Sequence, residues 1–282
     1  MAKTVLITGC SSGIGQATAK HFLAEGWNVA ATARSLESIE NWPRSRSLLR
    51  LQLDVTDEAS IARAVEATLA RFEAIDVLIN NAGYGLFGPV EGATAEEFEA
   101  IFRTNVFGTV AMIRHVLPSM RQSKSGTIIN MSSVAGRIGT AFLAPYHATK
   151  FAVEGLSESL RFELESHGIK VKIVEPGHFK SDFLTRSLRW TSHGAYEPQF
   201  GNMKGWIEGS GAKAAETSEV AKVIFRAASD GSKRLRYQAG AGVLMALHAL
   251  LPDGIWRKMV GAGMNRAPRA RQSPDARTSP SA

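Results

Sequence analysis

Short apolar segments rich in β-branched residues alternate with longer helix-like stretches over the first two thirds of the chain, and this alternation limits the possible folds most. The segments are apolar on both faces, as parallel strands are when helices cover both sides of a sheet. We therefore predict an α/β fold with a parallel sheet. The expected strands are TVLIT (4–8), NVAATA (28–33), LLRLQL (48–53), DVLIN (76–80), GTIINM (126–131) and KVKIVE (170–175).

The stretches between these strands have helical periodicity, and glycines mark two of their ends. Gly26 and Gly168 stand where helices are expected to stop. Helices are predicted at 13–25, 57–72, 95–117 and 146–167. After Pro176 the pattern changes: an irregular segment (181–213) precedes a helix (217–229), a short strand (234–238) and an apolar helix (243–263).

Composition and charge favour one globular domain followed by a basic tail. The 282 residues are 44% hydrophobic and 21% charged, an ordinary globular balance. The domain is expected over 1–265, with a disordered basic tail over 266–282. Four arginines against one aspartate give this tail a charge of +3 out of the total of +7. Without a basic stripe interleaved with aromatic residues, a solvated tail is favoured over a nucleic-acid site.

Cysteine content and apolar run lengths indicate a cytoplasmic protein. Cys10 is the single cysteine, so no disulfide can form within the chain, which suits a reducing compartment. The first residues, MAKTVLITG, lead straight into a strand without a signal-peptide pattern. The longest apolar stretch, 239–251, contains His248 and is too short to span a bilayer as a helix.

A glycine-rich loop, TGCSSGIG (8–15), follows the first strand and opens the first helix. Such a loop lets the backbone approach a pyrophosphate, while the helix N-terminus offers N–H groups and a favourable dipole. The context of strand, loop and helix makes a dinucleotide site the preferred interpretation of Gly9, Gly13 and Gly15. Cys10 lies inside the loop with no base beside it, and is expected to be a small filler residue.

The end of the second strand bears on which dinucleotide binds. An acidic residue there would bind the ribose 2′-hydroxyl of NAD, but this strand ends in Ala33 and Arg34. Arg34 can instead pair with a 2′-phosphate, which favours NADP over NAD; the alternative is an ordinary surface arginine. Asp54, after the third strand, is suited either to accept from the adenine amino group or to cap the helix that starts near Asp57.

Four motifs in order make the chain resemble the classical short-chain dehydrogenases/reductases. They are TGCSSGIG, NNAG (80–83), SS (132–133) before YHATK (146–150), and PG (176–177). The resemblance runs from about residue 3 to 185, and more loosely to about 260. It implies a single-domain Rossmann-like, doubly wound sheet with helices on both faces, and an NADP-preferring oxidoreductase. The C-terminal ending is similar to that of the members that act on retinoids and steroids.

The resemblance also implies roles for individual residues. Asn105, Ser133, Tyr146 and Lys150 would form the catalytic set, with Ser133 chosen over Ser132 because it stands thirteen residues before Tyr146. Ser181 stands where the family usually has threonine, so the hydroxyl is kept. The expected cofactor-binding residues are Gly9, Ser11, Ser12, Gly13, Ile14, Gly15, Arg34, Ser35, Asp54, Val55, Asn81, Ala82, Gly83, Tyr146, Lys150, Pro176, Gly177, Phe179 and Ser181.

The YHATK motif places a phenol and an ammonium on one face of a helix, because residues four apart project together. A nearby lysine favours phenolate, so we expect Lys150 to lower the pKa of Tyr146 from its usual value of about 10. Tyr146 would then exchange a proton with the substrate oxygen, Ser133 would hold that oxygen, and Asn105 would bind a water that links Lys150 to solvent. His147 and His178 are expected to be packing or rim residues, and no metal site is predicted.

Substrate and partners are less constrained. The large apolar side chains of 181–213 favour either an apolar pocket under a lid, which suits a lipophilic ketone or alcohol, or packing of that segment on the domain. The apolar helix is expected to pack within the protein or at a dimer contact, and a membrane surface is the less favoured alternative. A homodimer or homotetramer is expected from the resemblance. The alternative to an enzyme is a non-catalytic NADP-binding regulatory protein on the same fold.

Overall fold

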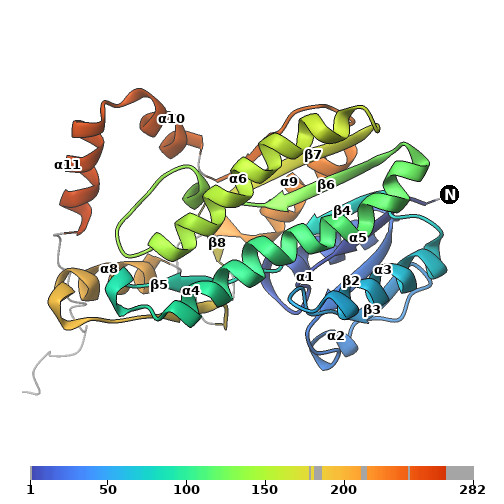
Figure 1. The fold of residues 1–282 in the computed structure, drawn as a ribbon, viewed down its shortest axis with the longest axis horizontal. Coiled ribbons are helices and arrows are strands. Elements are labelled where there is room, and N and C mark those ends of the chain that lie inside the picture. Colours follow the sequence, from blue (N-terminus) through green and yellow to red (C-terminus); the bar gives the residue numbers. More distant parts are fainter. Residues whose placement is uncertain (1, 178, 181–185, 211–214, 241, 265–282) are drawn as a thin grey trace, which may run out of the picture.

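The computed structural model describes residues 2–177, 179–180, 186–210, 215–240 and 242–264. Its central sheet has the strand order β11-β7-β6-β4-β1-β2-β3, and every neighbouring pair is parallel (Figure 1). The strands are β1 (Thr4–Ile7), β2 (Asn28–Ala33), β3 (Leu48–Gln52), β4 (Val77–Asn80), β6 (Gly126–Met131), β7 (Ile169–Pro176) and β11 (Arg236–Ala239). The predicted parallel α/β fold is confirmed, and each predicted strand is present within two residues of its expected bounds.

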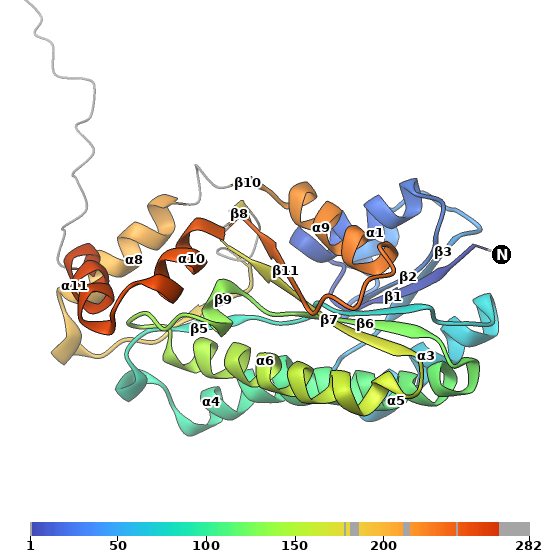
Figure 2. The same ribbon diagram turned by 90° about the horizontal axis from the view of Figure 1, so that it is seen from above.

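Helices cover both faces of the sheet, as Figure 2 shows. On one face lie α1 (Gly13–Ala24) and α9 (Thr217–Ser229); on the other lie α3 (Glu58–Phe72), α5 (Gly108–Ser123) and α6 (Ala144–Glu165). Successive residues of β1 explain why both faces are apolar. Val5 and Ile7 enter the core beneath α1 and α9, whereas Leu6 enters the core beneath α3, α5 and α6.

Local sequence signals set the helix boundaries. Asp57 caps α3, since its carboxylate accepts from the backbone N–H of Ala59 at 2.9 Å. Thr94 and Glu97 form a capping box at the start of α4 (Ala95–Phe102). Gly26 and Gly168 follow α1 and α6 with left-handed φ angles of 80° and 71°, in agreement with their predicted place at helix ends.

The helix predicted over 95–117 is in fact two helices with a wider turn between them. A π-helical turn over Arg103–Phe107 separates α4 from α5, and α5 continues to Ser123. Such turns inside helices are frequent at functional sites. The remaining short elements of this half are α2 (Glu37–Glu40), β5 (Gly85–Phe87) and two 3₁₀ turns, η1 (Val90–Gly92) and η3 (Val134–Gly136).

The segment predicted to be irregular, 181–213, contains regular structure where the model describes it. β9 (Leu188–Trp190) pairs in parallel with β5, and helix α8 (Gln199–Ser210) follows a 3₁₀ turn, η4 (Gly194–Tyr196). A second short ladder joins β8 (Phe179–Lys180) to β10 (Ala215–Glu216). The prediction of an irregular segment was therefore wrong for residues 188–190 and 199–210.

The apolar helix predicted over 243–263 is also two helices, α10 (Gly242–Leu250) and α11 (Asp253–Met264). The break lies at Pro252, which lacks an N–H and clashes with the preceding turn of a continuous helix. Trp256 packs inward, whereas Leu250 and Ile255 are exposed. In the part of the chain that the model describes, no helix is both long enough and apolar enough to cross a bilayer. The predicted tail, 266–282, lies outside the described residues.

Candidate active site

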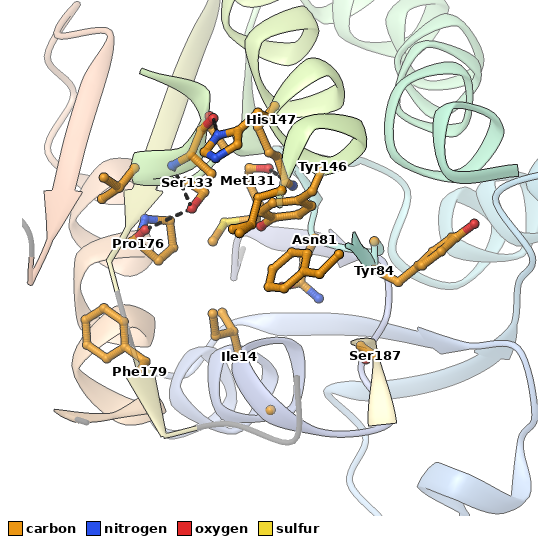
Figure 3. Close-up of a pocket in the computed structure, with 18 of the residues that line it drawn as sticks. Ile14, Asn81, Tyr84, Met131, Ser133, Tyr146, His147, Pro176, Phe179 and Ser187 are labelled. Atoms are coloured by element: carbon orange, nitrogen blue, oxygen red, sulfur yellow. Dashed lines mark hydrogen bonds between the residues drawn. The ribbon is translucent and has the colours of Figure 1, made fainter. Parts of the chain in front are cut away.

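A large cleft opens at the carboxyl ends of the central strands, where ligands bind in open α/β sheets. Its volume is about 1840 Å³. Small-molecule sites usually span about 300–1,000 Å³, so this cleft has room for a dinucleotide and a substrate together. Figure 3 shows side chains from several parts of the chain, among them Ile14, Ser133, Tyr146 and Phe179, around this space.

The glycine loop forms the floor of one end of the cleft. Gly9 and Gly13 have φ angles of 74° and 56°, in the left-handed region that favours glycine. At Gly15, a Cβ atom would lie 2.2 Å from the carbonyl oxygen of Gly9 and 2.5 Å from Nδ2 of Asn81, so a side chain has no space there. Ser11, Ser12 and Ile14 line the cleft beside these glycines. The loop thus exposes backbone next to the start of α1, as a pyrophosphate site requires.

The NNAG turn is bonded directly to this loop. Asn81 Nδ2 donates to the carbonyl oxygens of Thr8 at 2.8 Å and Gly9 at 3.1 Å. The Thr8 hydroxyl oxygen accepts from the backbone N–H groups of Asn81 and Ala82, both at 2.9 Å. Gly83 continues the lining, and a Cβ there would lie 3.0 Å from Oδ1 of Asn105. The two motifs form one rigid wall of the cleft.

Residues after β2 and β3 line the end of the cleft beyond the glycine loop. Arg34, Asp54 and Val55 border this end, whereas Ser35 is exposed and lies outside the lining. Oδ1 of Asp54 accepts from the N–H and the hydroxyl of Thr56 at 2.9 and 2.7 Å. Asp57, and not Asp54, caps α3. The structure therefore removes the helix-capping alternative for Asp54.

Ser133 and Tyr146 meet at the other end of the glycine-lined space. Tyr146 is buried, and burial raises the pKa of its phenol to about 12, although a hydrogen bond with the Ser133 hydroxyl acts in the opposite direction. Ser133 also donates to the carbonyl oxygen of Pro176 at 3.3 Å and accepts from the N–H of Ala135 at 3.1 Å. We had expected Lys150 to lower the pKa of Tyr146; in this structure burial prevails.

Lys150 lies one helical turn from Tyr146 and is buried beside it. Its Nζ donates to the carbonyl oxygen of Met131 at 2.8 Å and stands 5.7 Å from the centre of the Tyr146 ring. Burial lowers the pKa of Lys150 to about 8, and the carboxylate of Glu154 opposes this shift. The phenol and the ammonium thus lie side by side, both buried, at the wall of the same cleft.

Asn105 lies in the π-helical turn, behind the lining of the cleft, and is 2% exposed. Its amide Nδ2 donates to the carbonyl oxygen of Tyr84 at 2.9 Å and to the hydroxyl of Thr149 at 3.1 Å. Its Oδ1 accepts from the N–H of Tyr84 at 3.0 Å. The side chain therefore joins the NNAG turn to α6, and its two N–H groups are both used by the protein.

The end of β7 forms the remaining wall. Pro176, Gly177 and Phe179 line the cleft, and the N–H of Gly177 donates to the carbonyl oxygen of Ala239 at 2.8 Å. Phe179 packs against Gly240, where a Cβ would lie 2.8 Å from the phenyl ring. Ser181 and His178 lie outside the described residues. The predicted cofactor-binding residues that the model describes thus surround one cleft, with the exception of Ser35.

Comparison with known proteins agrees with this geometry. A family model described as short chain dehydrogenase matches residues 3–192. The chain belongs to the short-chain dehydrogenase family.

Relatives of this short-chain dehydrogenase include oxidoreductases of different organisms. An uncharacterized oxidoreductase of Schizosaccharomyces pombe is 37% identical over 228 residues, which is 77% of this chain and 95% of the relative. A 3-ketodihydrosphingosine reductase of Bacteroides thetaiotaomicron is 44% identical over 179 residues, covering 64% of this chain and 65% of that protein. The protein is an oxidoreductase of this family.

Solved structures confirm the fold and show nucleotides in its neighbours. A short-chain dehydrogenase from Streptomyces avermitilis has a TM-score of 0.79 at 33% identity, covering 92% of this chain and 95% of that one. ElxO with NADP bound has a TM-score of 0.73 at 29% identity, with coverage of 86% and 100%. A 3-ketoacyl-(acyl-carrier-protein) reductase from Brucella melitensis, complexed with NADH, scores 0.72 at 26% identity, with coverage of 84% and 97%. Neighbours in the family thus bind either nicotinamide dinucleotide.

Two residues that sequence reasoning did not place in the site shape it nonetheless. His147 Nδ1 lies 2.7 Å from the carbonyl oxygen of Ala135, and its Nε2 accepts from the N–H of Thr140 at 3.1 Å. Burial lowers the pKa of His147, so the neutral ring holds the loop that follows Ser133. Phe87 packs edge-on against Tyr146 at 5.5 Å between ring centres. The position of His147 inside YHATK is a sequence signal that it lies at the site, whereas the sequence around Phe87 contains no such signal.

Cys10 has the inert environment expected of a filler residue in this loop. Its thiol is fully buried, and burial raises its pKa to about 12. A thiol with such a pKa remains protonated at neutral pH and is a poor nucleophile.

Away from the glycine loop, the cleft is lined by a set of apolar side chains, and charged residues such as Arg186, Arg189 and Arg234 also line it. Ile138 and Leu143 come from the segment between Ser133 and Tyr146, and the other apolar side chains come from three C-terminal helices, α8, α10 and α11. Those helices contribute Met203, Trp206, Ile207, Leu244, Leu247, Trp256, Met259 and Val260. The C-terminal elements thus form a wall of the same cleft that contains Tyr146.

Proposed function

We propose that this short-chain dehydrogenase is an NADP(H)-dependent oxidoreductase that interconverts a carbonyl and a secondary alcohol on a lipophilic substrate. One observation carries the proposal: a buried phenol, Tyr146, is hydrogen-bonded to Ser133 and lies beside the buried ammonium of Lys150 in the cleft that also contains the glycine loop. A proton donor, a hydroxyl that can hold an oxygen and a cation, gathered at one wall of the cleft, match acid–base chemistry on a substrate oxygen.

The glycine loop and the walls beside it fit a dinucleotide. Gly9, Gly13 and Gly15 would hold its pyrophosphate, Asn81 to Gly83 its adenosine side, and Pro176, Gly177 and Phe179 its nicotinamide side. When bound, the nicotinamide supplies or accepts the hydride. The protein then contributes position, electrostatics and proton transfer.

In the reductive direction, Tyr146 donates its proton to the substrate oxygen as negative charge develops there. The pKa of about 12 keeps the phenol protonated at neutral pH, and so ready to donate. Ser133 donates a hydrogen bond to the same oxygen, for which it would exchange its bond to the carbonyl of Pro176. Lys150 stabilises the phenolate that remains. Oxidation of an alcohol reverses these steps.

The side chain of Asn105 contributes to the site by holding its parts together. Because its amide is bonded to Tyr84 and Thr149, we assign the side chain to holding the π-helical turn against α6. The water-binding role that we expected for Asn105 would then fall to its main-chain carbonyl oxygen, which also accepts from the hydroxyl of Thr109 at 3.0 Å.

Three observations support NADP and a lipophilic substrate. Arg34 borders the cleft at the end of β2, where a guanidinium is suited to a 2′-phosphate. The opposite half of the cleft is lined by apolar side chains of α8, α10 and α11. The relative from Bacteroides thetaiotaomicron is named for reduction of a long-chain ketone, 3-ketodihydrosphingosine. We therefore place the substrate among ketones and secondary alcohols with an extended apolar group.

A panel of carbonyls and alcohols, followed by nicotinamide absorbance, tests the proposal. It should contain ketones of increasing chain length, each assayed with NADPH and with NADH. We expect kcat/KM to rise with chain length, since each buried methylene contributes about 0.8 kcal/mol, and to be higher with NADPH. Turnover restricted to short polar carbonyls would contradict the lipophilic substrate, and a preference for NADH would contradict the role of Arg34.

A further inference from the structure

The face of α6 that carries the catalytic pair continues into a second set of charges. Tyr146, Lys150, Glu154 and Glu158 follow one another at four-residue spacing, so each lies one turn from the next on adjoining parts of the helix surface. Lys150 and Glu154 are buried, at 8% and 5% exposure. The proposed function uses Tyr146 and Lys150, and leaves the buried carboxylate of Glu154 without a role.

Glu154 is part of a buried ionic network that joins three elements. Its Oε2 accepts from Nε of Arg236, on β11, at 3.0 Å. The same Nε lies 3.2 Å from Oε1 of Glu175, on β7, and Nη2 of Arg236 also bonds to Glu158. Glu175 is fully buried and also pairs with a second arginine, Arg137, whose Nη1 lies 3.3 Å from Oε1 of Glu175. Glu175 directly precedes Pro176, which lines the cleft.

This network is costly as a purely structural feature. Two buried carboxylates share one arginine, and the remaining oxygen of Glu175, Oε2, is buried without a hydrogen-bond partner among the described residues. Buried ion pairs are often no more stabilising than apolar side chains of the same volume. The position of Glu154, one turn beyond Lys150, indicates an electrostatic role in the site.

We propose that Glu154 is a positioning residue: its buried carboxylate is the counter-charge that keeps the Lys150 ammonium charged and in place, and Arg236 keeps Glu154 itself ionised. The inference rests on the proposed function only for its catalytic consequence, because the charge state of Lys150 is a property of the protein alone.

The electrostatic balance around the two groups agrees with this role. Burial lowers the pKa of Lys150 to about 8, and Glu154 opposes that shift. Burial also raises the pKa of Glu154, and Glu175 acts in the same direction, whereas a hydrogen bond with Ser132 and the contacts with Arg236 oppose both. The charged groups that face the pair are thus Glu158 on α6, Glu175 on β7 and Arg236 on β11, with Arg137 bound to the far side of Glu175.

The Lys150 titration in the cofactor-free protein tests the proposal directly. Lysine labelled with ¹³C at Cε would be followed by NMR across pH, with Lys150→Met used to assign the resonance. In Glu154→Gln we expect Lys150 to lose its proton at a pH lower by about one unit or more, the effect of removing a charge partner. Glu154→Asp keeps the charge and should recover most of the wild-type titration.

Glu158→Gln is the matched control. Glu158 binds the same arginine but is mostly exposed, so its loss should leave the Lys150 titration within a few tenths of a pH unit of wild type. If Glu154→Gln does not fold, Arg236→Gln tests the same proposal. Without the cation of Arg236, Glu154 should bind a proton more readily. The positive charge of Lys150 then loses its partner, so Lys150 should again titrate at lower pH.

The positioning role of Glu154 and the proposed function can fail independently. An unchanged Lys150 titration in folded Glu154→Gln would overturn the positioning role, even if the enzyme reduces ketones as proposed. A shifted titration in a protein that turns over no carbonyl or alcohol would support the positioning role and count against the proposed function. In an active enzyme, the alkaline limb of kcat/KM should move to lower pH together with the Lys150 titration.

Discussion

The amide of Asn105 donates a hydrogen bond to the hydroxyl of Thr149, 3.1 Å away, and so fixes the π-helical turn against the helix that carries Tyr146 and Lys150. Thr149 is fully buried, and its own hydroxyl donates to the carbonyl oxygen of Tyr146 at 2.8 Å. Thr149, inside YHATK, therefore connects the motif to the rest of the site, while Tyr146 and Lys150, at its two ends, line the cleft.

Replacing Thr149 with valine should lower the free energy of unfolding by about 1–3 kcal/mol. Valine keeps the shape but leaves a buried N–H of Asn105 without its acceptor. Urea denaturation measures the change. Thr149→Ser keeps the hydroxyl and loses one methyl group, so it should cost about 1 kcal/mol. If valine is no more destabilising than serine, the Asn105–Thr149 bond does not contribute as described.

The glycine loop gives a sharper steric prediction. Gly15→Ala would place a Cβ atom 2.2 Å from a backbone oxygen, that of Gly9, which cannot move away as the end of a side chain can. We expect dinucleotide affinity, measured by quenching of protein fluorescence, to fall by about 5–150-fold, because overpacking of this kind costs about 1–3 kcal/mol. Wild-type affinity in this variant would contradict the role of the glycine loop as the pyrophosphate-binding site.

Gly155→Ala is the matched control for that substitution. Gly155 is exposed in α6, and a Cβ there would meet nothing within 4 Å. Alanine should stabilise the helix by about 0.5–1 kcal/mol and leave dinucleotide affinity unchanged.

The central sheet and the cleft could be predicted from the sequence because their signals are local. Strands apolar on both faces, such as Thr4–Ile7, indicate a covered parallel sheet. The glycine spacing after β1 reflects the left-handed φ angles of Gly9 and Gly13 and the close approach of Gly15 to Gly9. The four-residue spacing of Tyr146 and Lys150 follows from helix geometry alone.

Features that depend on tertiary packing could not be predicted in this way. Helix α8 contains Gly201, Gly205 and Gly209, each unfavourable in a helix, and it forms because Phe200 and Ile207 are buried. The raised pKa of Tyr146 depends on how deeply the phenol is buried, which the motif does not show. Glu154 was visible beside Lys150, but Arg236 and Glu175 reach it only through β11 and β7.

Arg34→Ala should weaken NADPH binding and leave NADH binding nearly unchanged. A charge-assisted hydrogen bond is worth about 1.5–3 kcal/mol, or roughly 10–100-fold in affinity. Titration of the two cofactors by fluorescence measures the ratio. Arg44→Ala removes an exposed arginine outside the cleft lining and should alter neither affinity. An equal loss for NADH and NADPH would show that Arg34 does not read the 2′-phosphate.

Tyr146→Phe separates catalysis from cofactor binding. The substitution removes the proton donor but keeps the ring that packs on Phe87, so we expect kcat to fall by about 10²–10⁴ while the Kd for NADPH stays within about twofold. Single-turnover absorbance and a cofactor titration give the two numbers. A rate equal to that of wild type would exclude Tyr146 as the acid. If the protein is instead a non-catalytic NADP-binding regulatory protein, the wild type itself would show no turnover.

The rate of carbonyl reduction should decline on the alkaline side because of Lys150 rather than Tyr146. The pKa of Lys150 is lowered to about 8, so its charge is present below that pH and is lost above it. The pKa of Tyr146 is raised to about 12, so the phenol keeps its proton over the whole accessible range. A profile of kcat/KM against pH reports the groups of the free enzyme. We expect it to be flat from about pH 6 to 7.5 and to fall with a midpoint near 8, at the pH where the NMR titration of Lys150 has its own midpoint. A decline that begins only above pH 10 would assign the limb to Tyr146 instead, and would show that a neutral Lys150 still supports the reaction.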